Sequence, residues 1–431
     1  MVVTRGRSAL VPGDRRLRIL YVQAAGGGGS GTGLHQLLRT LDHEQFEPIV
    51  LVYERTPQCD DFSTAGARVV VLNEVSNAAA VRGLPGKVRR GRIRAPEWRS
   101  VRRLVARDVG LARRILPIVR AERIDLVHHN NQPPGNRPSI LAARWARVPQ
   151  VAHVRFLPRY ALADRFVARS VDRFVFVSQA VQLHATAGLG RATNRGQVVY
   201  DPFDFAAFDV AAGRSGTIRR ELGIADEAFV VTNVGRLVPW KGQDVFLRAV
   251  AEVAREHPQV SALIVGEAKP TPADQDYHRR LRALVDELGI ADRVHFAGFR
   301  TDIPEILVAS DLAVHSATKP EPFGRVVVEA MAARRPVIAT GAGGVLEIVQ
   351  EGETGLLVPL GDAPAMAAAI RRFVEHGELG PSMGERARAD VETRFSEARF
   401  RSALHKLYGS TLGLRPSSGP RESRNREAMR A

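Results

Sequence analysis

Short apolar runs alternate with helix-length segments along most of this chain, and that alternation limits the folds open to it. The runs have the length and composition of strands that are buried on both faces of a parallel sheet. They lie at 18–22, 49–52, 68–72, 125–128, 150–154, 173–177 and 197–200, and again at 229–234, 262–265, 294–297, 312–315, 336–340 and 355–358. Two such series predict an α/β protein with two doubly wound parallel sheets, each covered by helices on both faces.

The chain has 431 residues, which is too long for one hydrophobic core, so each series should form its own Rossmann-like domain. We predict an N-terminal domain over 1–205 and a C-terminal domain over 206–395, facing a central cleft. A helix over 396–412 should pack back towards the N-terminal domain, and the basic tail at 413–431 should be disordered. Ligands of such sheets gather beyond the carboxyl ends of the strands.

The composition favours a soluble protein in a reducing compartment. No window approaches the roughly 18 consecutive apolar residues that a membrane span requires. The start of the chain should not be a signal peptide, because Pro12, Gly13 and Asp14 interrupt its apolar run. Cys59 is the only cysteine, which excludes an internal disulfide. We therefore expect a cytoplasmic protein.

Arginine carries nearly all of the positive charge, and the net charge is +16. It is densest between Arg82 and Arg120, where few acids offset it. Nucleic acid, an anionic membrane or a phosphorylated substrate would each match such a segment. We disfavour nucleic acid, because the chain has no zinc-ligand spacing, RNP-like aromatic motif or arginine-glycine repeat. Two interpretations of the segment remain open: contact with an anionic membrane or lipid-phosphate acceptor, and a plain solvated helix.

A glycine-rich loop, Gly26 to Gly33, follows the first apolar run and precedes a helical segment. Glycines let a backbone approach a ligand closely at a helix start, so Gly27, Gly28 and Gly29 are candidate binding residues. The loop also contains a dinucleotide fingerprint, and the second strand ends near an acid, Glu54. We disfavour an NAD site, because nothing downstream supports hydride transfer, and we predict no cofactor.

Polar residues gather at the carboxyl ends of three strands in the first series. They are His129 and Asn130, then His153 and Arg155, and then Asp201. On the first of these strands His128 and His129 are adjacent, and adjacent side chains of a strand point to opposite faces. A metal site there is therefore disfavoured. A hydrogen-bonding role in a cleft fits these side chains better, and we predict no metal.

The stretch 319–333 places Glu321 and Glu329 eight residues apart, with a turn at Gly324 that should open a helix. The N–H groups at that helix start would favour a phosphate, while the two carboxylates could bind hydroxyl groups. Two surface charges on a core helix are the alternative. The glycine run at 341–344 should precede a second helix that favours an anion. At the first of these two helix starts, the one after Gly324, the N–H groups that would favour a phosphate belong to Arg325, Val326 and Val327.

Further candidates follow strands of the second series. Two cations come after the first of them, Arg236 and Lys241. The planar guanidinium of Arg236 and the mobile ammonium of Lys241 both suit a diphosphate. Gly266 ends another strand, and Phe299 and Arg300 follow a third. These loops could hold a nucleotide base.

Together these residues resemble the retaining glycosyltransferases of the GT-B fold, specifically the family 4 group. The resemblance is carried by GRLVPWKG at 235–242, by the E-x7-E element EPFGRVVVEAMA at 321–332, and by GAGGVLEIV followed by EGETGLLV at 341–358. It covers 18–407 and implies two Rossmann-like domains around a cleft. The donor, a nucleoside-diphosphate sugar, would bind mainly to the C-terminal domain, and the acceptor mainly to the N-terminal domain.

The resemblance also implies roles for residues. Glu321 would hold hydroxyl groups of the donor sugar, with backbone contacts from Phe323 and Gly324, and Glu329 would take the ribose hydroxyls. The glycine loop would approach the donor phosphates or the acceptor from across the cleft.

Arg236 and Lys241 would neutralise the diphosphate, and His153 matches the family's histidine near the reacting sugar. With Glu321, these are the catalytic residues that we predict, and the cations would replace a metal. The acceptor would meet His129, Asn130, Arg155 and Asp201. Many relatives read N-G-x-D where this chain reads DPFD from Asp201, so contacts there are open.

Two other functions fit the same architecture. A nucleotide-sugar 2-epimerase would convert the donor without an acceptor, and a catalytically silent protein would only bind the nucleotide sugar. The sequence leaves the base, the sugar, the acceptor and the linkage open, as well as peripheral contact with the inner face of a membrane.

Overall fold

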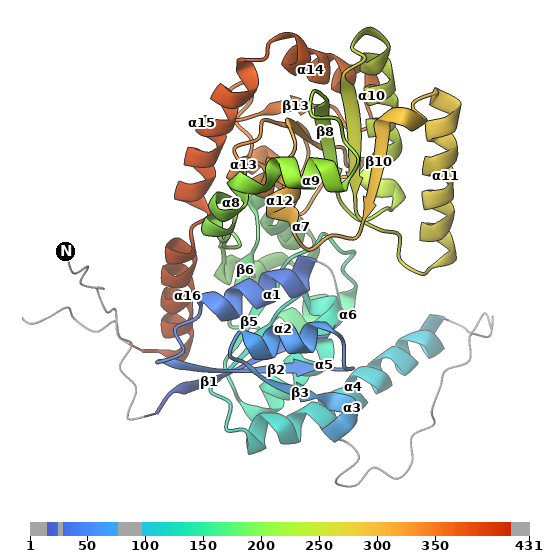
Figure 1. Ribbon diagram of the computed structural model, residues 1–431. Helices are drawn as coiled ribbons and strands as arrows, with labels where there is room; N and C mark the ends of the chain where they lie inside the picture. The colour runs from blue at the N-terminus through green and yellow to red at the C-terminus, as the bar shows by residue number, and fades with distance from the viewer. Residues whose placement is uncertain (1–14, 25–28, 76–96, 415–431) are drawn as a thin grey trace, which may run out of the picture.

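The computed structural model describes residues 15–24, 29–75 and 97–414. The chain folds into two α/β domains, one above the other in Figure 1, each built on one parallel sheet. The predicted fold class is therefore confirmed. The glycines at 27 and 28 and the first part of the arginine-rich segment lie outside the described residues.

The first sheet has seven strands in the order β3-β2-β1-β4-β5-β6-β7, and all its paired strands are parallel. Its strands are β1 (Leu17–Gln23), β2 (Phe46–Val52), β3 (Arg68–Val71), β4 (Leu126–His129), β5 (Gln150–Val154), β6 (Arg173–Phe176) and β7 (Gly196–Val198). Its helices are α1 (Gly29–Thr40), α2 (Gln58–Thr64), α3 (Leu72–Val75), α4 (Glu97–Ala121), α5 (Pro133–Ala146), α6 (Leu162–Ala168) and α7 (Gln179–Leu189).

The second sheet has six parallel strands in the order β10-β9-β8-β11-β12-β13. They are β8 (Phe229–Val234), β9 (Val260–Val265), β10 (Val294–Gly298), β11 (Leu312–His315), β12 (Val337–Thr340) and β13 (Leu356–Val358). The helices are α8 (Phe205–Ala211), α9 (Ser215–Glu221), α10 (Gln243–Glu256), α11 (Pro272–Leu288), α12 (Ile303–Val308), α13 (Arg325–Ala332), α14 (Ala363–Glu375) and α15 (Leu379–Arg394).

Each sheet reverses its strand order beside its first strand, between β1 and β4 and between β8 and β11. Such switch points open a crevice at the carboxyl ends of the strands, where α/β proteins bind ligands. In both domains the loops that follow these strands therefore carry the polar residues of interest.

Helix α16 (Glu397–Leu412) follows the second domain in sequence but packs against the first. Phe400, Leu404 and Tyr408 are buried in one core cluster with residues of β1, β2 and α1. Figure 1 shows α16 beside the first sheet, directly below α15 of the second domain. The chain thus crosses between the domains twice.

Aromatic side chains join the domains below the crevice. Phe203 from the first domain lies against Phe323 and Phe395, with ring centroids 6.3 Å apart in both pairs. Glu347 of the second domain accepts hydrogen bonds from the N–H groups of Gln179 and Ala180, each 2.8 Å long, at the start of α7. Among the described helices, none is long and apolar enough to cross a bilayer.

Candidate functional site

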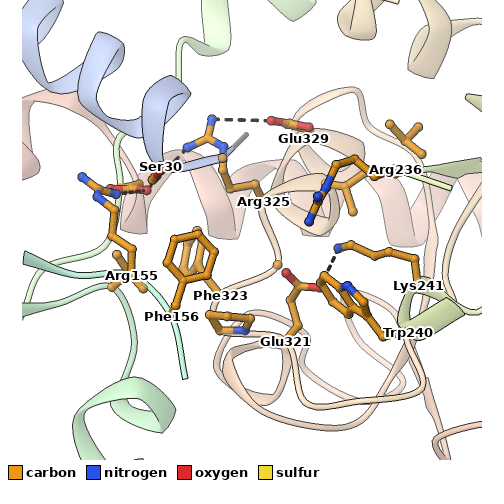
Figure 2. Close-up of a pocket in the computed structure, with 18 residues that line it drawn as sticks. Ser30, Arg155, Phe156, Arg236, Trp240, Lys241, Glu321, Phe323, Arg325 and Glu329 are labelled. Atoms are coloured by element: carbon orange, nitrogen blue, oxygen red, sulfur yellow. Dashed lines mark hydrogen bonds and ion pairs between the residues drawn. The ribbon is translucent and has the colours of Figure 1, made fainter. Parts of the chain in front are cut away.

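A cavity of about 280 Å³ lies between the two domains, at the carboxyl ends of both sheets. Figure 2 shows side chains from both domains pointing into it. The first domain supplies the start of α1 and the loops after β5, β6 and β7, and the second supplies the loops after β8 and β11 and the start of α13. The lining residues are Gly29, Ser30, Arg155, Phe156, Val177, Asp201, Val234, Gly235, Arg236, Trp240, Lys241, Glu321, Pro322, Phe323, Gly324, Arg325, Val326 and Glu329.

Glu321 is held by two neighbours on the second-domain side of the cavity. Its Oε2 accepts a 2.7 Å hydrogen bond from Lys241 Nζ and lies 3.3 Å from His315 Nε2. Burial alone would raise the pKa of Glu321, but the hydrogen bond with His315 and the charge of Lys241 outweigh it and lower this pKa to about 2. The carboxylate is therefore ionised at neutral pH and can only accept hydrogen bonds.

Helix α13 begins at the wall of the cavity. Gly324 precedes it with φ +109°, a conformation that favours glycine. The N–H groups of Arg325 and Val326 have no acceptor among the described residues, so they can bind an anion. The N–H of Val327 donates to the carbonyl of Gly324 over 3.0 Å. This N–H is therefore already bonded within the chain, and a contact of Val327 with a ligand stays a prediction.

Arg325 connects the two domains across the cavity. Its guanidinium lies 3.5 Å from Glu329, 3.7 Å from Asp201 and 4.4 Å from the ring centroid of Phe203. One of its terminal nitrogens, Nη1, is buried without a hydrogen-bonding partner among the described residues. Arg325 therefore retains a donor for a ligand group.

On the first-domain side, Arg155 and Asp201 form a buried ion pair. Arg155 Nη1 lies 2.6 and 2.7 Å from the two carboxylate oxygens of Asp201. Arg155 Nε also donates to Asn130 Oδ1, and Asn130 in turn donates to the carbonyl of Ser30 at the start of α1. Asn130 therefore fixes Arg155 and α1 relative to each other, and it does not itself line the cavity.

Lys241 and Arg236 lie on the opposite wall. Lys241 Nζ is 4.4 Å from the ring centroid of Trp240, which keeps the ammonium over an aromatic face. The side chain of Arg236 is exposed at the cavity mouth and has no ion-pair partner among the described residues. It is thus free to meet an incoming anion.

Two sequence profiles match this chain, one on each domain. "Glycosyl transferase 4-like domain" matches residues 28–201, and "Glycosyl transferases group 1" matches residues 215–390. Among solved structures, Anabaena HepE in complex with UDP and glucose superposes with a TM-score of 0.74 and is 26% identical. That superposition covers 92% of this chain and all of HepE. The chain belongs to the GT-B glycosyltransferases.

Curated relatives of this GT-B family member carry several names. The D-inositol 3-phosphate glycosyltransferase of Corynebacterium jeikeium is 40% identical over 193 residues, which cover 44% of this chain and 45% of that protein. The putative glycosyltransferase YtcC of Bacillus subtilis is 28% identical over 68% of this chain and 74% of its own length. Apart from YtcC, the chain matches about half the length of its first curated relatives.

The structure places two predicted histidines away from the cavity lining. His153 is fully buried behind Arg155, and its Nδ1 accepts from Arg155 Nη2 at 3.2 Å. Burial, Arg155 and His128 hold the pKa of His153 well below its usual value, so the ring is neutral. His129 is buried and bonded to Ser139 and Gln150. A contact of either histidine with a substrate stays a prediction.

The residues predicted to hold a base are also separate from this cavity. Gly266 lines a second cavity of about 300 Å³ beside β9 and β10, which lies next to Leu237. The side chain of Arg300 turns to Asp302 and Glu221, and Phe299 is exposed. Neither Phe299 nor Arg300 lines either cavity.

The prediction of a second anion-binding helix at 341–344 is wrong. The chain there forms only a short 3-10 helix, η5 (Gly344–Glu347), which cannot accumulate the dipole of a long helix. The glycines serve a packing role instead. A Cβ on Gly343 would lie 2.2 Å from the carbonyl oxygen of Glu321, and Gly344 N–H donates to that oxygen over 2.8 Å. The run therefore lets β12 support the Glu321 loop.

Ser30, Trp240 and His315 are among the residues of this site that the sequence did not single out. Ser30 and Trp240 adjoin Gly29 and Lys241, which were predicted, so proximity in the chain was the available signal. His315 is the last residue of β11, and its position at a strand end was visible. Its contact with Glu321 depends on the path of the intervening loop, which has no sequence signature. Among the described residues, no group of three or more His, Cys, Asp or Glu could hold a metal.

Proposed function

We propose that this protein is a glycosyltransferase that moves a sugar from a nucleoside-diphosphate sugar to an acceptor with retention of configuration. The observation that carries the proposal is the convergence of Lys241, Arg236 and the free N–H groups of α13 on one cavity, beside the ionised Glu321. Cations and helix N–H groups suit a diphosphate, and a carboxylate acceptor suits sugar hydroxyls. The family of the chain supports the same reaction class.

Breaking the bond between a sugar and a diphosphate builds negative charge on the leaving phosphate. Arg236 and Lys241 would stabilise that charge together with the N–H groups of Arg325 and Val326, all of which line the cavity. Glu321 would bind donor-sugar hydroxyls and would not act as a nucleophile. Glu329 would bind the ribose. In this scheme the protein's cations take the place of a metal ion.

The nucleotide base would occupy the second cavity, beside Gly266. This cavity adjoins the phosphate-binding wall because Leu237, which lines it, directly follows Arg236. A Cβ at Gly266 would lie 2.0 Å from the carbonyl oxygen of Gly235, so glycine brings β9 close to the loop after β8. UDP is the first nucleotide to test, since the similar Anabaena protein was solved with UDP.

Donor binding and turnover test the proposal together. A thermal-shift panel of UDP-, GDP- and ADP-sugars should show one base class that raises the melting temperature, because it binds only the folded state. Glu321→Gln and Arg236→Ala should weaken that shift. Lys406→Ala, at an exposed position of α16 (Glu397–Leu412) outside the cavity lining, serves as the matched control.

Turnover separates the alternatives. Product should form only with an acceptor present, should keep the donor's anomeric configuration by NMR, and should persist in EDTA. Conversion of the donor alone to an epimer would indicate the 2-epimerase. Binding without any turnover across a broad acceptor panel would indicate a silent binding protein. Absence of a thermal shift with every nucleotide sugar would contradict the proposal itself.

An amphiphilic acceptor at an anionic membrane is the acceptor class that we propose. Helix α6 carries Leu162 and Phe166 one turn apart, 80% and 68% exposed. Arg159 and Arg165 are exposed on the same segment, and no carboxylate is exposed over 156–171, all of which is described. Exposed apolar side chains that are surrounded by arginines, with no exposed carboxylate nearby, suit contact with an anionic lipid surface. The same anionic lipids would meet the described part of Arg82–Arg120.

Vesicle co-sedimentation tests this acceptor surface. The protein should sediment with vesicles of phosphatidylglycerol at low salt and not with phosphatidylcholine. The double variant Leu162→Ser, Phe166→Ser should lose most of that binding. Leu360→Ser removes an exposed apolar side chain of the other domain and should leave binding unchanged. Equal binding by the double variant would exclude α6 as the contact.

A further inference from the structure

His315 lies beneath Glu321, on the side away from the cavity. It is the last residue of β11, is only 5% exposed, and is absent from the cavity lining. Its ring contacts one residue at each nitrogen. Nε2 is 3.3 Å from Glu321 Oε2, and Nδ1 is 3.3 Å from Thr340 Oγ1. The ring therefore spans the distance from the fully buried Thr340 on β12 to the carboxylate.

The chemistry of these partners fixes the tautomer of a neutral ring. An ionised carboxylate only accepts hydrogen bonds, so Nε2 must carry the hydrogen that points to Glu321. The other nitrogen then accepts, and the hydroxyl of Thr340 can donate to it. Thr340 would thus orient His315, and His315 would orient Glu321.

The contacts of Glu321 divide between its two oxygens. Lys241 and His315 both meet Oε2. Oε1 has no partner among the described residues, and Glu321 lines the cavity. The anchored oxygen therefore leaves the other free to accept a hydrogen bond from a ligand.

The two anchors differ in mobility. Lys241 has a flexible stem that carries a point charge, and a diphosphate in the cavity would draw that charge towards itself. His315 is a rigid ring fixed at both nitrogens. It cannot follow the diphosphate, so it can hold Oε2 while Lys241 turns away.

We propose that His315 is a positioning residue, oriented by Thr340, that keeps Glu321 aimed at the donor sugar when Lys241 engages the diphosphate. This inference rests on the proposed function, because it requires a nucleotide sugar in the cavity. It assigns His315 no contact with the substrate. Its effect should therefore appear in binding of the sugar and not in binding of the nucleotide.

Calorimetry with two probes tests this division. The probes are UDP-glucose and UDP, or the nucleotide sugar and nucleotide that give the largest thermal shift. His315→Leu should weaken binding of the nucleotide sugar about tenfold and change binding of the nucleotide less than about twofold. His315→Gln keeps an N–H donor and should recover most of the loss, which a packing role would not explain.

Thr340→Val provides a second variant of nearly unchanged shape. It removes the donor to Nδ1 and should weaken the nucleotide sugar selectively, by less than His315→Leu, whereas Thr340→Ser should bind as the wild type does. If His315→Leu does not fold, the comparison of Thr340→Val with Thr340→Ser tests the positioning role by itself. Equal weakening of both probes, or no weakening of either, would overturn the positioning role. A wild-type protein that binds no nucleotide sugar would instead overturn the proposed function, and the inference with it.

Discussion

Glu321 should leave a signature in the pH dependence of stability. Its pKa is lowered to about 2 in the folded state, so the ionised form stabilises the fold above its ordinary value of 4.5 and loses this effect as pH falls towards 2. The free energy of unfolding should therefore drop by roughly 2 kcal/mol between pH 7 and pH 3 on account of this residue. Glu321→Gln should lack that part of the drop. Urea unfolding of both proteins at several pH values measures the difference, and parallel curves would contradict it.

Gly33 makes room for the buried pair of Arg155 and Asp201. A Cβ at this position would lie 2.6 Å from Arg155 Nη1 and 3.0 Å from Asp201 Oδ2. Gly33→Ala should therefore displace the pair and destabilise the protein by about 1–3 kcal/mol, although alanine favours a helix. Gly135→Ala is the matched control, because a Cβ there would meet no described atom within 4 Å apart from its chain neighbours and its own helix backbone. Thermal unfolding compares them, and equal melting temperatures would be the contrary result.

At the same scale, the sequence predicted which polar residues would face the cleft better than it predicted their partners. Arg236 and Lys241 were recognised from their places after a strand, and Glu321 from its spacing to Glu329 around the turn at Gly324; all three line the cavity. The bond between Lys241 and Glu321 joins residues 80 positions apart. Such pairing depends on the exact approach of two loops, which apolar periodicity does not encode. The burial of His153 was missed for the same reason.

At the scale of elements, helix α16 is part of the core of the first domain. Leu404 is 1% exposed and lies in the core cluster that contains Tyr21 and Phe46. Leu404→Ala should destabilise the protein by about 2–5 kcal/mol through lost burial and a residual cavity. Lys406→Ala, at an exposed position of the same helix, should be nearly neutral. Denaturant titration distinguishes them, and a small effect of Leu404→Ala would mean that α16 is dispensable.

Strands were the elements most readily predicted. Buried parallel strands are short apolar runs, so β8 and β11 were placed at their observed bounds. The helix expected after Gly344 was wrong because VLEIV has an apolar pattern that fits a helix as well as a loop packed on a core. Val345 and Ile348 are fully buried, yet the segment makes less than two turns of 3-10 helix. Tertiary packing overrode the local preference there.

At the scale of the whole molecule, Glu347 should restrain the two domains relative to each other. Its carboxylate accepts from the N–H groups of Gln179 and Ala180 across the domain boundary. Glu347→Ala should raise hydrogen exchange of these two amides about tenfold or more, since hydrogen bonds to a charge are strong. In the absence of donor, the same variant should also broaden the distribution of interatomic distances obtained from small-angle X-ray scattering. Glu353→Ala, at an exposed position of the same domain, should change neither; unchanged exchange in Glu347→Ala would show that other contacts suffice.

The two-domain arrangement followed from the two series of strands, but their relative placement did not. The aromatic contacts of Phe203, Phe323 and Phe395 join three distant segments, and each of these residues could equally have filled the core of its own domain. The spacing of apolar residues indicates that a side chain is buried, but it does not indicate which residue that side chain packs against. Domain packing therefore became visible only in three dimensions.

The return of α16 to the first domain has a consequence for synthesis on the ribosome. Tyr21 and Tyr408 share a hydrogen bond across 387 positions, and both are fully buried. Domains usually fold in order as they emerge, at about 5–20 residues per second. Here the first sheet emerges early but must wait some tens of seconds for the helix that covers β1 and β2. During that interval its apolar face is available to a chaperone or to a neighbouring nascent chain.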